Sequence, residues 1–582
     1  MVHLKEKKTK KKLPTPDRNK NLNVASNMYD IIIIGGGISG LYCAYKLLKK
    51  DKKLKVLVLE KNPKLGGRIS TYYGGKDDIS VSKDIIFEKG AGRFNDKHKL
   101  LNQLLDELNL SVKKIKITNV DESIWIPENK FLELRKRFPS MDDIIRTLRK
   151  QLKEKKVSNQ EIRKHNLQDL VKKYIPLNDK KEGSISDNYK LVKYMEEMYP
   201  YFAEQYNMNA LDALQVFSHD FKQDIQYYIL GGGLSQIIIH LAKQIVKLGG
   251  TINRGDIVNT ISKNVNDKLY IINNGNYRCK KIICSIPKPG IQKVIYLKRL
   301  LGSKILNTID CIPLYRIYAK YPLSSIQGEK KVWFTGMNKM VVNHPLKFIL
   351  PYGEKNGLIH ISYTDGKYAK FLWKKVIDGT INSYLDRELN KIFSGKIKGL
   401  NKIPKPEWIK HYYWECGMGS WKKGVNSKDI IKKVIKPLDK EEVYFCGENF
   451  SNQQAWIEGS LFTANIVLKK VIKLGNLRSI KDNISVSKNT KRKGNTKYKE
   501  TINGGGIKGY NMKEIKKHNS KKDAWMVIKG NVYDITEWID KHPGGDIIMK
   551  GVGKDATQLF KSIGHPEYVK KILKKMKIGK LV

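Results

Sequence analysis

Short apolar runs and a helical pattern alternate near the start of the chain. The apolar run at residues 31–34 predicts a buried strand, and the apolar spacing at 41–48 predicts a helix. A second apolar strand is predicted at 55–59. A strand, a helix and a second strand in this order indicate a Rossmann-like α/β fold with parallel strands.

The turn between the first strand and the helix contains Gly35, Gly37 and Gly40. Glycine permits a tight turn and lets backbone N–H groups approach a pyrophosphate, and the helix N-terminus favours negative charge. Glu60 follows Gly40 by twenty residues, at the strand end where an acidic side chain can accept hydrogen bonds from a ribose. We therefore predict a dinucleotide site rather than a glycine-rich turn without ligand. The expected contacts are Gly35, Gly37, Ile38, Ser39, Gly40, Glu60 and Lys61.

Later segments continue the alternation. Amphipathic helices are predicted within 97–224, for example at 99–110 and 141–152. A glycine turn, a helix and a strand follow from residue 226, and further strands are predicted at 281–286, 315–318 and 358–363. The segment from residue 226 is therefore predicted to belong to the same domain as the first strands, and the helices within 97–224 are predicted to be inserted between them.

Composition sets limits on the class of protein. The 582 residues suffice for two to four domains, and the formal net charge is +54. Basic residues dominate 1–27 and 476–509, but most of the excess is spread along the chain. This pattern fits solvated lysine-rich surfaces, or a basic tail that contacts nucleic acid. The composition also resembles that of proteins from large DNA viruses with AT-rich genomes.

The cysteines and the N-terminus indicate an intracellular, cytoplasmic protein, or one packaged in a virion. The six cysteines show no CxxC motif, and most lie in apolar strings, which predicts packed thiols in a reducing compartment. The first residues lack the apolar segment of a secretory signal, and no apolar run reaches membrane-spanning length. We therefore expect no membrane anchor.

Three further motifs extend the glycine turn. They are Gly66-Gly67-Arg68, the run from Glu88 through Gly90 and Ala91 to Arg93, and Gly447-Glu448 followed by Ala455-Trp456-Ile457-Glu458-Gly459. Together with GxGxxG, they resemble the flavin-containing amine oxidases, which include monoamine, polyamine and L-amino acid oxidases. The resemblance implies a Rossmann-like FAD-binding domain with an interleaved α+β substrate domain.

The resemblance also implies cofactor contacts beyond the glycine turn. A planar guanidinium after two glycines suits a phosphate, although a surface ion pair is the alternative for Arg68. Arg93 resembles the arginine that amino acid oxidases use for the substrate carboxylate, or it serves a phosphate or the flavin. Ser420 stands where some relatives carry a flavin-linked cysteine, so we expect non-covalent FAD. The implied contacts are Gly67, Arg68, Gly90, Ala91, Gly92, Arg93, Val258, Gly447, Glu448, Ile457 and Glu458.

Catalytic candidates come from the same resemblance. Trp421 and Trp456 would flank the substrate amine as an aromatic cage, or they are ordinary core residues. Arg316 gives the best local match to a lysine that the family places near the flavin, and its role stays open because the residue type differs.

The last segment resembles cytochrome b5. Its markers are the motifs His542-Pro-Gly-Gly545 and Gly564-His565, and a low-spin haem b needs two such axial imidazoles. His542 and His565 are therefore the predicted iron ligands, rather than core or surface histidines. The segment is basic, whereas cytochrome b5 usually has acidic docking patches, so its redox partner stays open.

These motifs predict four regions. A disordered basic tail covers 1–27, the amine oxidase domain 28–475, a flexible linker 476–509 and the cytochrome b5-like domain 510–582. Within the oxidase domain, the FAD part comprises 28–95, 225–290 and 440–475, and the substrate part comprises 96–224 and 291–439.

The resemblance implies oxidation of an amine, a polyamine or an L-amino acid, with oxygen as the acceptor and hydrogen peroxide as a product. One alternative is an electron-transfer chain from flavin to haem, as in a dehydrogenase or desaturase. Another is a structural virion protein that retains the flavin fold and binds nucleic acid through its basic tail.

Overall fold

The computed structural model describes most of the chain. The described residues are 28–117, 123–125, 131–175, 185–199, 201, 203–219, 225–326, 328–393, 395, 397, 400–472, 509–521, 523–542, 545–562, 573 and 576–582. They fall into two compact units, one within Met1–Arg478 and the other within Ser479–Val582. The predicted tail at 1–27, most of the predicted linker and His565 lie outside the described residues.

A seven-stranded sheet forms the first half of the larger unit. Its order is β10-β11-β12-β1-β2-β9, and β20 pairs with β12. The central pairs, β1 with β12 and β1 with β2, are parallel. The strands are β1 (Met28–Ile34), β2 (Val56–Glu60), β9 (Thr251–Arg254), β10 (Ile261–Lys263), β11 (Tyr270–Ile272), β12 (Tyr277–Cys284) and β20 (Val443–Phe445).

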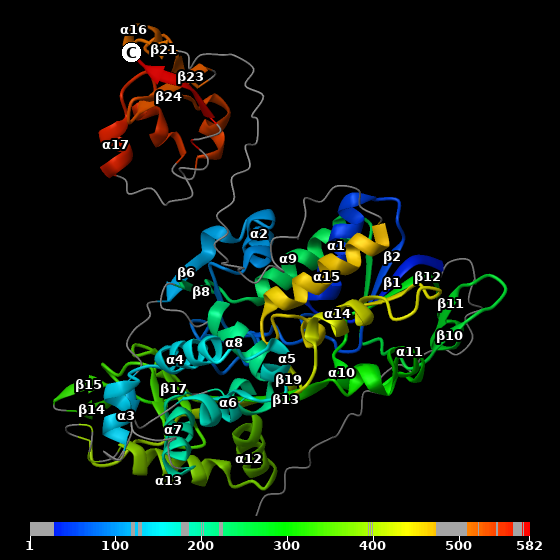
Figure 1. Ribbon diagram of the computed structural model, residues 1–582, viewed down its shortest axis with the longest axis vertical. Helices are drawn as coiled ribbons and strands as arrows, with labels where there is room; N and C mark the ends of the chain where they lie inside the picture. The colour runs from blue at the N-terminus through cyan, green and yellow to red at the C-terminus, as the bar shows by residue number, and fades with distance from the viewer. Residues whose placement is uncertain are drawn as a thin grey trace, which may run out of the picture. The chain divides into compact units, whose positions relative to one another are not determined.

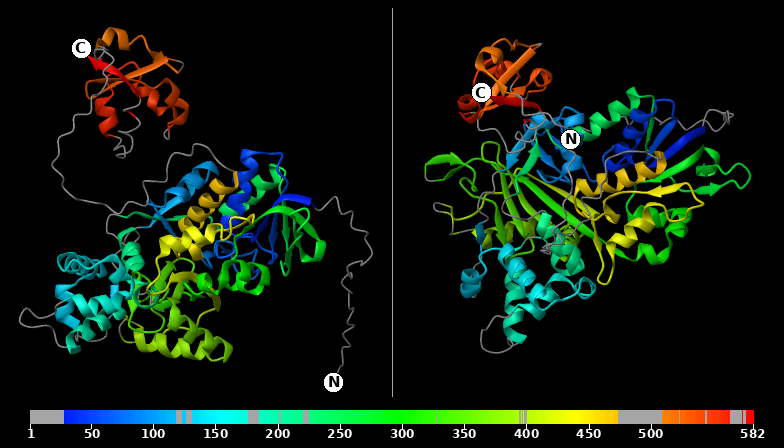
Figure 2. Two further views of the ribbon diagram at one scale, coloured as in Figure 1. Left: turned by 45° about the vertical axis from the view of Figure 1, so that its right-hand side comes forward. Right: turned by 45° about the horizontal axis from the view of Figure 1, so that its top comes forward.

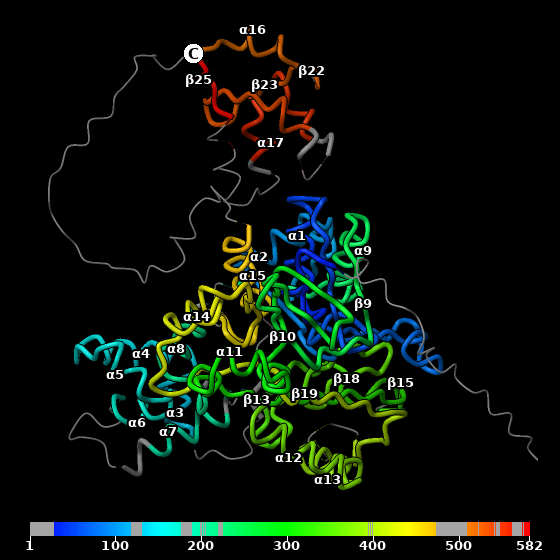
Figure 3. The backbone as a smooth tube through the Cα atoms, turned by 90° about the vertical axis from the view of Figure 1, so that its right-hand side faces the viewer, coloured from blue at the N-terminus to red at the C-terminus, as the bar shows by residue number. Residues whose placement is uncertain are grey.

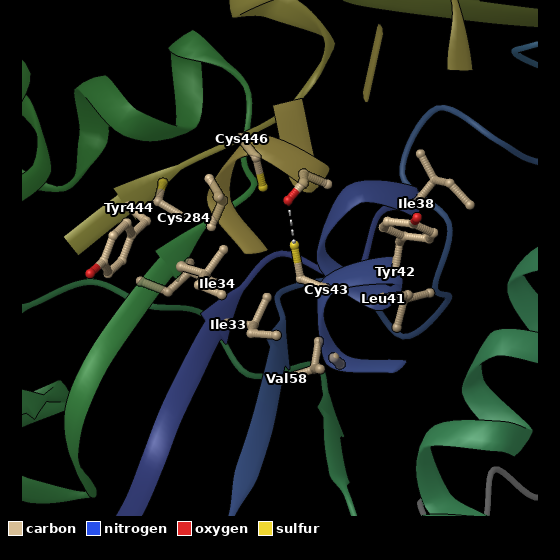
Figure 4. Close-up of a cluster of buried hydrophobic side chains, with 14 of the residues drawn as sticks. Ile33, Ile34, Ile38, Leu41, Tyr42, Cys43, Val58, Cys284, Tyr444 and Cys446 are labelled. Atoms are coloured by element: carbon tan, nitrogen blue, oxygen red, sulfur yellow. Dashed lines mark hydrogen bonds between the residues drawn. The ribbon is translucent and has the colours of Figure 1, made fainter. Parts of the chain in front are cut away.

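Three helices pack together beside this sheet: α1 (Ile38–Lys50), α9 (Ser235–Lys247) and α15 (Ile457–Ile472) (Figure 1). The β1 residues 31–34 are almost fully buried, because parallel strands are apolar on both faces. Figure 4 shows Ile33 and Val58 of neighbouring strands beneath Leu41 and Cys43 of α1. The Cys43 thiol contacts the carbonyl oxygen of Ala464 in α15 at 4.0 Å, so strands and helices share one core.

Short strands and a helix connect the two halves of the unit. β3 pairs with β4, and β8 lies between β5 and β6. Their bounds are β3 (Thr71–Tyr73), β4 (Ile86–Glu88), β5 (Phe94–Asn95), β6 (Lys114–Ile117) and β8 (Tyr227–Leu230), and α2 is Lys99–Glu107.

A second sheet of six strands has the order β19-β13-β18-β17-β16-β7. One face packs against α12 (Gly366–Ile377) and α13 (Ile381–Phe393), which lie together beside it in Figure 3. Tyr315 and Ile317 point to that face, whereas Arg316 and Tyr318 belong to the other. The strands are β7 (Ser123–Trp125), β13 (Ile309–Lys320), β16 (Met340–Val342), β17 (Phe348–Gly353), β18 (Leu358–Asp365) and β19 (Trp408–Trp421).

The remaining helices have two locations. Those of residues 132–219, mostly cyan in Figure 2, gather at the end of the unit away from the blue α1 and share a core of their own. They are α3 (Leu132–Arg137), α4 (Met141–Glu154), α5 (Asn159–Arg163), α6 (Leu167–Tyr174), α7 (Ile185–Met198) and α8 (Ala210–His219). The others, α10 (Lys288–Lys293), α11 (Ile295–Leu306) and α14 (Ser427–Ile435), contribute to the core of the first sheet.

The smaller unit is a five-stranded sheet of order β21-β25-β24-β23-β22. Its core contains Met526, Tyr533, Ile539 and Val552. The elements are β21 (Gly509–Tyr510), α16 (Met512–Ile515), β22 (Asn519–Ser520), β23 (Asp523–Ile528), β24 (Asn531–Asp534), α17 (Thr557–Ser562) and β25 (Lys577–Leu581).

The predicted fold class is confirmed, as are the main elements, including the strand and helix around the glycine turn. Boundaries moved by a few residues; β12, for example, ends at Cys284, and Pro287 is the N-cap of α10. Within the described part of the chain, no helix is both long and apolar enough to cross a bilayer.

The expectation of packed thiols is corrected at one pair. Cys311 and Cys416 form a disulfide between β13 and β19, because these neighbouring strands bring two residues together that are 105 positions apart. The other four cysteines, Cys43, Cys279, Cys284 and Cys446, are buried free thiols. Spacing alone could not indicate the pair, since it depends on a long-range register.

Candidate functional site

The glycine turn has little room for side chains. Gly35 has a φ of +109°, a conformation that favours glycine. A Cβ on Gly40 would lie only 2.1 Å from the carbonyl oxygen of Gly35. These two positions therefore require glycine for a tight passage from β1 to α1.

Gly37 has the opposite surroundings. It is the N-cap of α1, and no side chain caps the helix there. A Cβ on Gly37 would meet no atom within 4 Å, and one on Gly67 would meet only the Cα of Gly37, at 3.6 Å. Open space thus faces the first turn of α1, with Ile38 and Ser39, where backbone N–H groups and the helix dipole favour an anion.

Glu60 lies at the end of β2, beside the same turn. Its Oε2 accepts a hydrogen bond from the N–H of Gly36 at 2.8 Å, and its Oε1 accepts two from Asn62. Lys61 follows and is exposed. An open cavity of about 1090 Å³ lies next to this strand end, and Ile257 and Asn259, the two neighbours of Val258, line it.

Glu448 joins three segments that are far apart in the sequence. Its Oε1 accepts hydrogen bonds from the backbone N–H groups of Gly419 in β19 and of Ala455, both at 2.8 Å. Its Oε2 forms an ion pair with Arg68 at 2.5 Å and also accepts a hydrogen bond from Asn449. Because Glu448 is only 3% exposed, this network lies inside the protein.

Arg68 is more accessible than its partner and also donates to the carbonyl oxygen of Gly417. Its own carbonyl oxygen accepts the N–H of Ala91 at 2.9 Å, and a Cβ on Gly90 would lie 2.0 Å from that oxygen. The Gly-Gly-Arg motif and the motif that ends at Arg93 are therefore adjacent in space.

The C-terminal motif has mainly structural contacts. The carboxylate of Glu458 accepts the N–H groups of Leu100 and Leu101 and so caps the start of α2. Gly447 has a φ of +130°, and its N–H donates to Thr463. Ile457 is buried. A direct FAD contact of Glu458 or Ile457 stays a prediction.

Next to Gly92, aromatic and cationic side chains from distant segments contact one another in a row. Arg93 donates to the Tyr201 hydroxyl at 2.9 Å, and its guanidinium lies 4.9 Å from the centre of the Tyr227 ring. The Tyr227 ring faces Trp456 at 6.4 Å. On its other side, Tyr201 contacts Tyr363 of β18 at 5.5 Å.

Arg316 completes this row. Its guanidinium lies 4.3 Å from the centre of the Tyr363 ring and donates to the carbonyl oxygen of Glu88 at 3.0 Å. A Cβ on Gly92 would be 3.1 Å from its Nη1. Arg316 therefore lies directly against the motif that ends at Arg93. We call Arg93, Tyr201, Arg316 and Tyr363 the cationic wall.

The two tryptophans of the expected cage have separate surroundings. Trp421 is 1% exposed, donates its indole N–H to the carbonyl oxygen of Ser451, and packs near Phe450. Trp456 is half-buried and contacts His98 at 4.7 Å. No ring contact joins the two tryptophans in the described structure, so their pairing around an amine stays a prediction. Ser420 is buried beside Trp421.

Several residues of this region escaped the sequence interpretation. Tyr201 lies between helices, and the others lie in the strands β8, β13, β17 and β18: Tyr227, Tyr318, Tyr352, His360 and Tyr363. No motif marks them, and only their long-range packing against Arg93 and Arg316 reveals them.

The larger unit fits a flavin dinucleotide. The open space before α1 suits a pyrophosphate, Glu60 lies at the strand end, and Arg68 follows Gly67, which lies next to Gly37. Within the described residues, no side chain fills the space in front of Gly37, and this observation carries the fit.

Of the two predicted haem ligands in the smaller unit, only His542 lies among the described residues. His542 follows the turn that ends at Lys541 and is half-buried near Ile539 of the apolar core. Trp538, Ile548 and Phe560 pack against that core. These side chains suit one side of a planar apolar group with an imidazole ligand. The second predicted ligand, His565, lies outside the described residues.

Comparison of the smaller unit with known proteins identifies its class. A sequence profile of the cytochrome b5-like heme/steroid binding domain matches residues 511–582. Over 76 residues, the chain is 50% identical to an acyl-lipid (8-3)-desaturase of Physcomitrium patens and 42% identical to cytochrome b5 of Drosophila melanogaster. These matches cover 13% of this chain, and they span 16% of the desaturase and 57% of the cytochrome b5.

The larger unit resembles two solved flavoprotein structures. A putative protoporphyrinogen oxidase from Exiguobacterium aligns with a TM-score of 0.51 and 15% identity, over 77% of this chain and 98% of the other. A redesigned putrescine oxidase aligns with a TM-score of 0.52 and 16% identity, over 77% and 100% of the two chains. At such identities the likeness concerns the fold alone.

A sequence profile of the flavin containing amine oxidoreductases matches residues 38–467, which is most of the chain. The match begins just after Gly37 and includes Gly40, Arg68, Glu448 and the cationic wall. The chain therefore belongs to the flavin containing amine oxidoreductase family and carries a C-terminal cytochrome b5-like domain.

Proposed function

We propose that the larger unit oxidises an amine with non-covalently bound FAD and passes the electrons to oxygen. The observation that carries this proposal is the open space before α1, bounded by Gly37 and Gly67, with Arg68 and Glu60 nearby. The cationic wall supports a separate substrate region next to Gly92. Ser420 supports non-covalent binding, because a hydroxyl replaces the linking thiol of some relatives.

In the reaction that we propose, oxygen is the final acceptor of the electrons. When bound, FAD supplies a two-electron acceptor for the hydride of the carbon next to the substrate nitrogen. The substrate amine loses two electrons and two protons and becomes an imine, and oxygen gains both to become hydrogen peroxide. Water then adds to the imine and yields a carbonyl compound and ammonia, or a smaller amine.

The residues of this chain contribute binding and positioning. The N–H groups at the start of α1 would hold the pyrophosphate, and Glu60 would accept hydrogen bonds from a ribose. The aromatic side chains of the wall, together with Tyr227 and Trp456, would exclude water from the reacting carbon. They would also favour the neutral, reactive amine by desolvation.

The cytochrome b5-like domain favours a second function. We propose that it binds haem b through His542 and His565, and that the haem can take electrons from the flavin. In that case the chain would act as a dehydrogenase rather than as an oxidase. Nucleic acid binding by 1–27, and packaging in a virion, stay predictions.

The first prediction concerns the substrate. We expect the purified protein to release hydrogen peroxide with at least one compound in an aerobic panel of monoamines, polyamines and L-amino acids. A peroxidase-coupled assay measures this release, and protein heated until it has lost its flavin is the control. If no compound yields peroxide and none reduces the flavin under argon, amine oxidation is contradicted.

The second prediction concerns the haem. Under argon, rapid mixing with an active substrate should bleach the flavin first and reduce the haem afterwards, if the two cofactors exchange electrons. The variant His542→Ala should retain flavin reduction but lose the haem signal, because an axial ligand is missing. If the haem stays oxidised while the flavin is reduced, the electron-transfer function is contradicted. The oxidase function then remains as the proposal.

The third prediction concerns Glu448. The variant Glu448→Gln should lower the free energy of unfolding of the larger unit by about 3 kcal/mol, since it leaves Arg68 without its buried charge partner. Release of flavin fluorescence during urea unfolding measures this change. The matched variant Glu107→Gln breaks only surface pairs with Lys46 and Lys49 and should cost less than about 1 kcal/mol. Equal effects of the two variants would argue against a central role for Glu448.

A further inference from the structure

The disulfide between Cys311 and Cys416 crosses an irregular part of the second sheet. The pairing of β13 with β19 shifts its register there, so that residues 415–417 of β19 face only Pro313 of β13. We call residues 415–417 the bulge. Proline has no backbone N–H to donate and interrupts a ladder of hydrogen bonds. The disulfide therefore supplies a covalent link at the place where the backbone pairing is broken.

The bulge reaches the buried ion pair through the residue after Cys416. The carbonyl oxygen of Gly417 accepts a hydrogen bond from the Arg68 guanidinium at 3.0 Å. Gly417 also packs closely against β13, since a Cβ on it would lie 2.4 Å from the Cβ of Leu314. The position of this acceptor for Arg68 thus depends on how the bulge is held against its neighbouring strand.

Cys311 lies opposite a second anchor of the same ion pair. In the register of the sheet it pairs with Gly419. The N–H of Gly419 donates to Oε1 of Glu448 at 2.8 Å. The two ends of the disulfide therefore adjoin the acceptor that holds Arg68 and the donor that holds Glu448.

Asn449 gives the sulfur of Cys416 a further contact with this network. The sulfur lies 3.8 Å from Oδ1 of Asn449, which accepts the N–H of Lys288 at 2.9 Å. The amide nitrogen of Asn449 donates to Glu448 at 2.9 Å. A disulfide sulfur has no proton, whereas a thiol at Cys416 could donate to Asn449 and compete with Lys288. The redox state of this sulfur thus changes what Asn449 can do for Glu448.

The disulfide is also the cysteine group that a reductant can reach most easily in the described part of the chain. Thiol–disulfide exchange requires that a thiolate contact one of the two sulfurs. Cys311 is only half-buried. The free cysteines of the described residues are all buried: Cys43, Cys279, Cys284 and Cys446.

We propose that this disulfide is a redox-modification site that controls how tightly the larger unit holds its flavin. A dithiol would reduce it: the disulfide gains two electrons and two protons and becomes two thiols, and the dithiol loses both and becomes a disulfide. Reduction would release the bulge and weaken the support of Arg68 and Glu448. The inference rests on the proposed FAD binding, in which Arg68 is an expected contact.

The first test compares FAD binding in the two redox states. The full-length holoenzyme is held under argon with or without dithiothreitol, and ultrafiltration of a dilution series separates free FAD from bound FAD. Reduction should weaken FAD binding about tenfold or more, because a charged hydrogen bond loses its fixed acceptor. Reoxidation should restore the affinity. Alkylation of thiols followed by mass spectrometry shows whether Cys311 and Cys416 are the residues that change.

The second test uses variants of single cysteines. Cys311→Ala should bind FAD as weakly as the reduced protein and should not respond to dithiothreitol, because it cannot form the disulfide. Cys279→Ala is the matched control, since this free thiol lies in β12 and not in the second sheet. It should bind FAD like the unchanged protein and keep the response. If Cys311→Ala does not fold, the comparison of redox states in the unchanged protein decides.

The third test uses the reciprocity of coupled equilibria. If reduction weakens FAD binding tenfold, bound FAD must disfavour reduction by the same factor, which lowers the midpoint potential of the disulfide by about 30 mV. Titration in dithiothreitol redox buffers, with and without excess FAD, measures this shift.

Three results separate the inference from the function on which it rests. Reduction that lowers thermal stability but leaves the FAD dissociation constant unchanged would make the disulfide a structural cross-link and overturn the proposal. A disulfide that dithiothreitol reduces only after the protein unfolds would also overturn it. Oxidised, folded protein that holds no FAD would contradict the proposed function itself, and the inference with it.

Discussion

The buried ion pair between Arg68 and Glu448 is the interaction on which the site depends. Glu448 lies near the end of the sequence of the larger unit, and Arg68 lies near its beginning. The same carboxylate accepts the N–H groups of Gly419 and Ala455, which precede the two tryptophans. The desolvated Glu448 side chain thus links the first sheet, the second sheet and the start of α15. Loss of the Arg68 charge would leave the Glu448 carboxylate buried without its cation, and loss of the Glu448 charge would leave Arg68 half-buried without its anion.

This constraint also explains how a cofactor region and a substrate region come to adjoin. The carbonyl oxygen of Arg68 accepts a hydrogen bond from the N–H of Ala91, and the next residue, Gly92, lies against Arg316 of the second sheet. The space before α1 has backbone donors and glycines, which suit a pyrophosphate. Beyond Gly92 lie aromatic rings and guanidinium groups. The chemistry changes from one region to the other within a few residues.

The parts predictable from the sequence were those that depend on local spacing. The strand, glycine turn and helix at 31–48 could be predicted because turn geometry and burial leave a regular signature in neighbouring residues. Tyr201, Tyr352 and Tyr363 could not be found, since their proximity to Arg93 and Arg316 depends on how separate elements pack. The disulfide between Cys311 and Cys416 escaped for the same reason. Glu458 could be located by its motif, but its role as the cap of α2 required the fold.

The central claim is that one chain combines a flavin amine oxidoreductase domain with a haem-binding domain. An absorption spectrum of the purified full-length protein tests it most directly. We predict the two bands of oxidised flavin together with a haem Soret band, in a ratio of one flavin to one haem. Flavin that is released intact by denaturation would confirm non-covalent binding. A spectrum that lacks either the flavin bands or the Soret band, from protein that is folded and supplied with both cofactors, would contradict this combination.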